Sequence, residues 1–217
     1  MFDASLIDLR TGLEWLSERG FQEDEAFLDY GCGSGVLAIA ARKLGCPTAV
    51  GVDVEYEALE SAAENAERNG ITDGVEWIHG RFVIPGMDEY DAVVANILVF
   101  RGASRIMTCT PSTRRLLAHP THRLICAQVG QLSRPSMVAT LALGTKVGGA
   151  LCLSGIRPDQ CEVLERLYAP YYDVASKVFR DPDDFGKEYW GSWARLILRR
   201  KEVDRRELLE RISEDVM

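Results

Sequence analysis

The stretch Phe27-Leu28-Asp29-Tyr30-Gly31-Cys32-Gly33-Ser34-Gly35-Val36-Leu37-Ala38-Ile39-Ala40 decides the fold of this 217-residue chain. A short run of mostly apolar residues carries one acid, glycine then occupies every second position, and an apolar helical pattern follows at once. This order is typical of a strand, a tight turn and a helix. Together they form the opening unit of an open α/β sheet that holds a nucleotide-like ligand at the turn.

The spacing of the glycines narrows the class of ligand. A dinucleotide fingerprint, G-x-G-x-x-G, needs its third glycine at the position of Val36, whereas the third glycine of this chain is Gly35. A pyrophosphate also requires a helix N-terminus brought close to it. S-adenosylmethionine has no phosphate and needs only a glycine-lined floor under its ribose and methionyl parts, so the spacing favours that cofactor.

The residues from Asp29 to Gly35 resemble motif I of the class I S-adenosylmethionine-dependent methyltransferases. Further stretches resemble one family of these enzymes, which methylates lysines and the N-terminal amine of ribosomal large-subunit protein eleven and has eukaryotic relatives that act on mitochondrial proteins. The resemblance covers roughly residues 4 to 97 and 131 to 200. The stretches are Leu37-Ala38-Ile39-Ala40-Ala41, Gly51-Val52-Asp53, Glu60-Ser61-Ala62-Ala63-Glu64-Asn65-Ala66, Ala95-Asn96-Ile97-Leu98 and Leu153-Ser154-Gly155-Ile156.

The resemblance implies an α/β, Rossmann-like class I methyltransferase fold. Its sheet has seven strands in the order 3-2-1-4-5-7-6, mostly parallel with one antiparallel strand, and carries helices on both faces. We expect a single methyltransferase domain over residues 1–217, with an insertion at about 99–130 and a C-terminal helical tail at 201–217. Periodicity and turn residues predict strands at 26–30, 48–53, 75–79, 90–95, 150–154, 171–180 and 192–199, and helices at 4–19, 35–44, 55–69, 133–144 and 158–167.

Two polar residues at predicted strand ends are candidates for binding and catalysis. Asp53 follows Asp29 by 24 positions, close to the spacing at which an acid meets a ribose diol. The alternative for Asp53 is a strand-end acid that caps the next helix. Asn96 follows the strand at 90–95, and the lack of prolines after it argues against base methylation and favours an aliphatic amine, as in the resembled family. The alternative for Asn96 is a helix N-cap.

The predicted site follows from the motifs and the resemblance together. Asn96 is the predicted catalytic residue, because no dedicated general base is visible and its amide can orient an amine. No metal is expected, since Cys109, His119, His122 and Cys126 match no common zinc spacing. The predicted cofactor-binding residues are Asp29, Gly31, Gly33, Gly35, Asp53 and Asn96.

Some features depart from the resembled family. The Gly-Thr-rich loop and the separate N-terminal recognition domain are absent, which indicates either a natural minimal form or a truncated sequence. Gly80-Arg81 stands where an acidic or amide side chain usually holds the adenine amino group, and His79 is expected to be a satisfied core or strand-end histidine. The segment 99–130 has three readings: a substrate-gripping lip, a disordered insert, or residues foreign to the mature protein.

The distribution of charge limits the classes of partner that this chain can bind. The net charge is −8, which disfavours binding to nucleic acid, yet no acidic residue lies between Asp91 and Asp159, and that interval holds eight basic ones. The acidic remainder of the chain would attract a lysine-bearing substrate. The basic interval, 99–157, is the part that could bind RNA or an acidic partner. The alternative is that both charged regions are simply solvent-exposed surfaces without a partner.

The six cysteines form no C-x-x-C pair, and no apolar run reaches the length of a membrane span. We therefore expect reduced thiols and a cytoplasmic location, with an organelle as the alternative.

Three functions are compatible with this sequence. The first is an S-adenosylmethionine-dependent methyltransferase that acts on protein amines, either a lysine side chain or an N-terminal amine, by in-line methyl transfer. The second is a small-molecule methyltransferase, which motif I and Asp53 fit equally well. The third is a catalytically idle protein of the same fold that binds RNA or an acidic partner through its basic interval.

Overall fold

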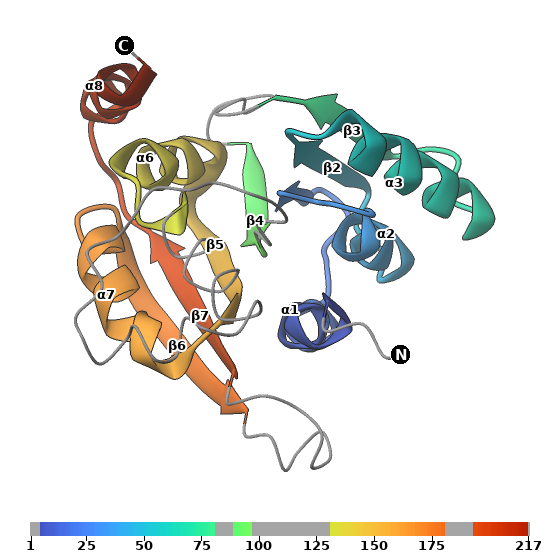
Figure 1. Cartoon of the computed structure of the whole chain (residues 1–217), viewed down its shortest axis with the longest axis horizontal. Coiled ribbons are helices and arrows are strands. Elements are labelled where there is room, and N and C mark those ends of the chain that lie inside the picture. Colours follow the sequence, from blue (N-terminus) through green and yellow to red (C-terminus); the bar gives the residue numbers. More distant parts are fainter. Residues whose placement is uncertain (1–4, 81–88, 97–130, 181–192, 217) are drawn as a thin grey trace, which may run out of the picture.

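The computed structural model describes residues 5–80, 89–96, 131–180 and 193–216 (Figure 1). Its seven-stranded sheet has the order β3-β2-β1-β4-β5-β7-β6, and β7 alone runs antiparallel to its neighbours. This arrangement confirms the fold class and the strand order expected from the sequence. The strands are β1 (Ala26–Tyr30), β2 (Thr48–Asp53), β3 (Val75–His79), β4 (Tyr90–Ala95), β5 (Thr145–Ile156), β6 (Tyr172–Arg180) and β7 (Trp193–Arg200).

Helices cover both faces of the sheet (Figure 1). One face carries α1 (Ser5–Arg19), α2 (Val36–Lys43) and α3 (Tyr56–Arg68). The other carries α6 (Pro135–Gly144), α7 (Pro158–Tyr168) and α8 (Arg205–Val216). The predicted insertion at 99–130 lies outside the described residues.

Each face of the sheet has its own apolar core. On the α1–α3 side, the fully buried Leu16, Phe27 and Leu37 belong to one cluster. On the other side, α6 is buried along its length from Ser136 to Gly144, because the sheet lies on one side of it and α8 packs on the other. Met137, Leu141 and Leu143 of this helix are all buried.

Strand β5 is longer than the sequence predicted. The pair Gly148-Gly149 indicates a turn before a strand at 150–154, but the strand begins at Thr145. The register with β4 shifts between the pairs Tyr90–Thr145 and Ala92–Ala150, so the glycines form an irregularity inside the strand. Gly148 has φ 78, a conformation that glycine adopts without strain, and the pairing therefore continues past it.

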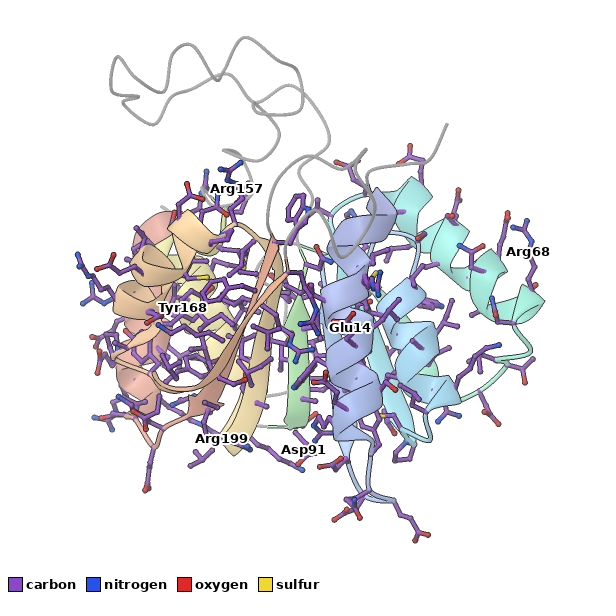
Figure 2. The ribbon with its side chains drawn as sticks, turned by 90° about the horizontal axis from the view of Figure 1, so that it is seen from below. Glu14, Arg68, Asp91, Arg157, Tyr168 and Arg199 are labelled. Carbon is purple, nitrogen blue, oxygen red and sulfur yellow. The ribbon has the colours of Figure 1, made fainter. Side chains whose placement is uncertain are left out.

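The polarity of the sheet decides where ligands can bind. In Figure 2, Arg157, which follows β5, lies at one edge of the sheet, while Asp91, near the start of β4, and Arg199, near the end of the antiparallel β7, lie at the opposite edge. The carboxyl ends of the parallel strands therefore face the Arg157 edge. In open α/β sheets the ligand crevice lies outside these carboxyl ends.

The cysteines of the described regions are free and buried, as expected for reduced thiols: Cys32, Cys46, Cys152 and Cys161. In the same regions there is no cluster of His, Cys, Asp and Glu suited to a metal ion. None of the helices that the structure describes combines the length and the apolar character needed to cross a membrane.

Candidate cofactor and active site

The glycine loop after β1 is folded against the end of β2. The backbone N–H groups of Gly31 and Cys32 both donate to the carbonyl of Val52, at 2.8 and 3.0 Å. Gly35 then donates to Cys32 O at 2.8 Å, which closes the turn into α2. All three alternate glycines have positive φ, between 51° and 77°. Side chains at these positions would strain the backbone, so the loop requires glycine for its conformation.

Two of these glycines have different surroundings. A Cβ atom at Gly35 would lie 2.6 Å from the Trp77 ring and 2.9 Å from the Cβ of Ala62, so this glycine allows β3 and α3 to pack against the start of α2. A Cβ atom at Gly33 would meet nothing within 4 Å. Gly33 therefore provides open floor beside the turn, where a ligand can approach the backbone.

Asp29 is buried beneath this floor, with 1% of its surface exposed. Its Oδ2 accepts a hydrogen bond of 3.1 Å from the backbone N–H of Ala38, in the first turn of α2. Burial raises the pKa of Asp29 to about 7; the hydrogen bond from Ala38 opposes this effect, and the nearby charge of Asp53 adds to it. The structure thus places Asp29 where it fixes the start of α2.

Asp53 ends β2, and its half-buried carboxylate joins two segments of the site. Oδ2 accepts from the N–H of Gly33 at 2.8 Å, and Oδ1 accepts from the N–H of Glu55 at 3.0 Å. An ionised carboxylate has about four acceptor positions, so two backbone donors leave capacity for two hydroxyl groups. A vicinal diol at the edge of the glycine floor fits this remaining capacity.

Asn96 directly follows β4 and is 5% exposed. Its neighbour Ala95 pairs with Tyr30 of β1 and with Leu153 of β5. Asn96 therefore lies at the carboxyl edge between Gly31 and Ser154, next to the glycine floor. The alternative reading, a helix N-cap, concerns residues that begin at 97 and lie outside the described part.

The end of β3 supplies contacts that the sequence did not reveal. His79 ends β3 in register with Asp53, and its Nε2 lies 2.9 Å from the carbonyl oxygen of Val54. The His79 ring stacks on Tyr56, with 3.7 Å between centroids and 12° between planes. The N–H of Gly80 donates to Asp53 O at 2.9 Å. These contacts join the ends of β2 and β3 beside the predicted ribose site, and no sequence signal linked His79 to Tyr56.

The predicted residues thus form one group at one edge of the sheet. Gly33 and Asp53 are joined by a hydrogen bond, Gly31 and Asn96 are adjacent across neighbouring strands, and Asp29 supports the loop from below. A model of the family described as "Ribosomal protein L11 methyltransferase (PrmA)" matches residues 10–126, more than half of the chain.

The chain belongs to the ribosomal protein L11 methyltransferase family. Two curated members illustrate the similarity. The ribosomal protein L11 methyltransferase of Chromobacterium violaceum is 35% identical over 173 residues, which cover 78% of this chain and 45% of that protein. The one from Dechloromonas aromatica is 40% identical over 162 residues, covering 75% and 42% of the two chains. This member of the family therefore spans about half the length of the curated relatives that it matches.

A solved structure supports the fold independently. The crystal structure of a ribosomal protein L11 methylase from Lactobacillus delbrueckii subsp. bulgaricus aligns with a TM-score of 0.59 at 24% identity, over 89% of this chain and 79% of that chain. The family model extends to residue 126 and so includes much of the segment 99–130, the predicted insertion.

Proposed function

We propose that this chain is an S-adenosylmethionine-dependent methyltransferase that acts on amines of protein substrates. The observation that carries the proposal is the hydrogen bond between the Gly33 N–H and the Asp53 carboxylate, which fixes an acid with spare acceptor capacity beside an open glycine floor. Membership of the L11 methyltransferase family supports the same reaction.

The residues present fit the cofactor. The loop of Gly31, Gly33 and Gly35 would form the floor under the cofactor, Asp53 would accept hydrogen bonds from its ribose diol, and Asp29 holds the start of α2 in place from below. When bound, the cofactor supplies a methyl group activated by its sulfonium charge. The protein therefore has to align a nucleophile rather than activate a leaving group. Such orientation can supply about 7–11 kcal/mol.

The amine must reach the site in its neutral form. A lysine with the reference pKa of about 10.4 needs roughly 4.6 kcal/mol to lose its proton at pH 7. Asn96 is almost completely buried at the strand end, and an amine drawn into such a place loses solvation that favours its charged form. The Asn96 amide oxygen accepts an N–H of the amine, so that the nitrogen lone pair faces the methyl group. In this mechanism Asn96 positions the amine and does not remove its proton.

The family and the charge support one class of substrate. The relatives are named for ribosomal protein L11, and we propose a protein of that kind, methylated on a lysine side chain or on a free N-terminal amine. Outside the interval from Asp91 to Asp159 the chain carries 17 basic and 33 acidic residues, a balance of −16 that attracts a basic substrate. A cytoplasmic location, with an organelle as the alternative, is part of the same proposal.

Calorimetric titration tests the binding half of this proposal. We expect S-adenosylhomocysteine to bind the wild-type chain and to bind Asp53→Ala at least about tenfold more weakly, because two charge-assisted hydrogen bonds to the ribose are lost. The matched control is Asp73→Ala, since the Asp73 side chain is 90% exposed and its carboxylate pairs with Arg42, away from the glycine loop. Absence of binding by the wild type would remove the enzyme reading, and equal binding by Asp53→Ala would refute the role of Asp53.

Transfer of a radiolabelled methyl group tests the chemical half. Ribosomal protein L11 and a whole-cell lysate serve as acceptors, and label on protein bands is the expected result. Asn96→Ala should lose most of the transfer, because Asn96 positions the amine, and its affinity for S-adenosylhomocysteine should fall less than that of Asp53→Ala. Label found only in small molecules would favour a small-molecule methyltransferase instead.

A further inference from the structure

Helix α3 holds the outer part of the glycine loop through one side chain. Nδ2 of the half-buried Asn65 donates a hydrogen bond of 3.1 Å to the backbone carbonyl of Ser34. Oδ1 of the same amide lies 3.5 Å from Nη1 of Arg68, which is also on α3 and can only donate (Figure 2). The amide is therefore oriented with its nitrogen towards the loop. Asn65 belongs to the stretch 60–66, which carries part of the family resemblance but none of the predicted site residues.

Close packing of α3 against the loop keeps Asn65 within reach of it. Ala62 lies three residues before Asn65, on the same face of α3. A Cβ atom at Gly35 would lie 2.9 Å from the Cβ of Ala62, so the helix and the loop are in close contact there. Asn65 consequently reaches Ser34, the residue directly before Gly35, although Ser34 and Asn65 are 31 positions apart in the sequence.

The contact fixes the direction of one peptide group. The carbonyl of Ser34 and the N–H of Gly35 belong to the same planar peptide unit. Asn65 holds the carbonyl, and the N–H donates to the Cys32 carbonyl at 2.8 Å. Ser34 stands between Gly33 and Gly35, which both have positive φ, and glycine tolerates many other backbone conformations. Loss of the Asn65 amide would therefore free a carbonyl in a part of the chain that is able to reorient.

We propose that Asn65 is a positioning residue, which keeps the glycine loop in its binding conformation before the cofactor arrives. The inference rests on the proposed function, because the loop is the floor assigned there to S-adenosylmethionine. Asn65 acts through the backbone of Ser34 and not through the reacting groups. If the loop holds its binding conformation for only part of the time, the apparent dissociation constant rises in inverse proportion to that fraction. In the saturated enzyme the ligand itself orders the loop, so turnover stays the same.

Three variants test this role. Asn65→Ala removes the contact with the loop, and Asn65→Asp keeps the shape of the side chain but lacks the N–H donor. Asn69→Ala is the matched control, because Asn69 Nδ2 donates to the backbone carbonyl of Asn65 at 2.8 Å, an amide-to-carbonyl bond at the C-terminal end of α3. In calorimetric titration, S-adenosylhomocysteine should bind both Asn65 variants about fivefold more weakly than the wild type. It should bind Asn69→Ala as it binds the wild type.

Two further measurements separate positioning from a general loss of stability. In methyl transfer to ribosomal protein L11, the KM for S-adenosylmethionine should rise about fivefold in Asn65→Ala while kcat stays unchanged. Without ligand, hydrogen exchange at the Gly35 N–H should be faster in Asn65→Ala than in Asn69→Ala. Bound S-adenosylhomocysteine should remove this difference, because it orders the loop in both variants.

The outcomes separate the two proposals. If the wild type binds S-adenosylhomocysteine and either Asn65 variant binds it equally well, the role of Asn65 is refuted while the proposed function stands. Equal weakening in Asn69→Ala would also refute it, since any damage to α3 would then have the same effect. A fall in kcat with an unchanged KM would contradict it as well. If the wild type does not bind this ligand, the proposed function fails and this inference fails with it.

Discussion

Replacing Asp29 by asparagine is expected to remove a pH-dependent loss of stability that the wild-type chain carries. Asp29 is 1% exposed and its pKa is raised to about 7, chiefly by burial. In the unfolded chain the same carboxyl group loses its proton near its ordinary value of 3.8. Between these two values the folded state binds more protons than the unfolded state, so the free energy of unfolding falls as the pH rises.

The magnitude follows from the two pKa values. One tenfold difference in proton binding corresponds to about 1.36 kcal/mol, so the full penalty, reached above pH 7, is about 4 kcal/mol. At pH 4.5 roughly 1 kcal/mol of it is already present, because the unfolded group is mostly ionised there. The wild type should therefore lose about 3 kcal/mol from this group between pH 4.5 and pH 8. Asparagine keeps an oxygen for the Ala38 N–H and does not titrate.

Urea unfolding at the two pH values measures this difference. The stability of Asp29→Asn relative to the wild type should rise by about 3 kcal/mol from pH 4.5 to pH 8, and titration of all other groups cancels between the two proteins. Asp73→Asn, at a side chain that is 90% exposed, serves as control and should run parallel to the wild type. If Asp29→Asn also runs parallel to the wild type, Asp29 ionises normally in the folded chain and the reasoning from its burial is wrong.

Two further predictions concern the packing of the site and the other edge of the sheet. In urea unfolding, Gly35→Ala should lower the free energy of unfolding by about 1–3 kcal/mol more than Gly33→Ala does. Both substitutions place a side chain at a positive φ, but of the two new Cβ atoms only the one at position 35 would overlap Trp77. Equal losses of stability would contradict this difference in packing. Asp91→Ala should cost about 1–2 kcal/mol, since Oδ2 accepts from the Ala26 N–H; an unchanged urea midpoint would show that water replaces this contact.

Much of the fold could be read from short local patterns. Strands β1, β2, β3 and β4 begin and end where the sequence predicted, because each is a short apolar run bounded by glycine, an acid or an amide. β5 was predicted too short, since its first residues pair with β4 across a register shift that depends on a partner 55 positions away, as the Tyr90–Thr145 pair shows. Local sequence carries no sign of such a partner.

In the candidate site, too, some features were predictable from local sequence and others depend on distant partners. Spacing placed Asp29 and Asp53 at neighbouring strand ends, but it could not separate their roles, since burial is decided by what packs around each carboxyl group. The α2 backbone covers Asp29, and two loops leave Asp53 half-buried. The partner of Gly35 is Trp77, and the partner of His79 is Tyr56, each more than twenty positions away.

The position of a residue within its own strand is therefore predictable from sequence, because it depends only on the number of residues from the nearest turn. The contacts across the end of the sheet are not predictable in this way, because they depend on how β2 and β3 are aligned after folding. His79 shows the consequence. Its identity as a strand-end histidine was available from the sequence, but its hydrogen bond to the Val54 carbonyl and its stacking on Tyr56 depend on where the end of β2 and the start of α3 lie after folding. Contacts of this kind thus depend on the pairing between strands.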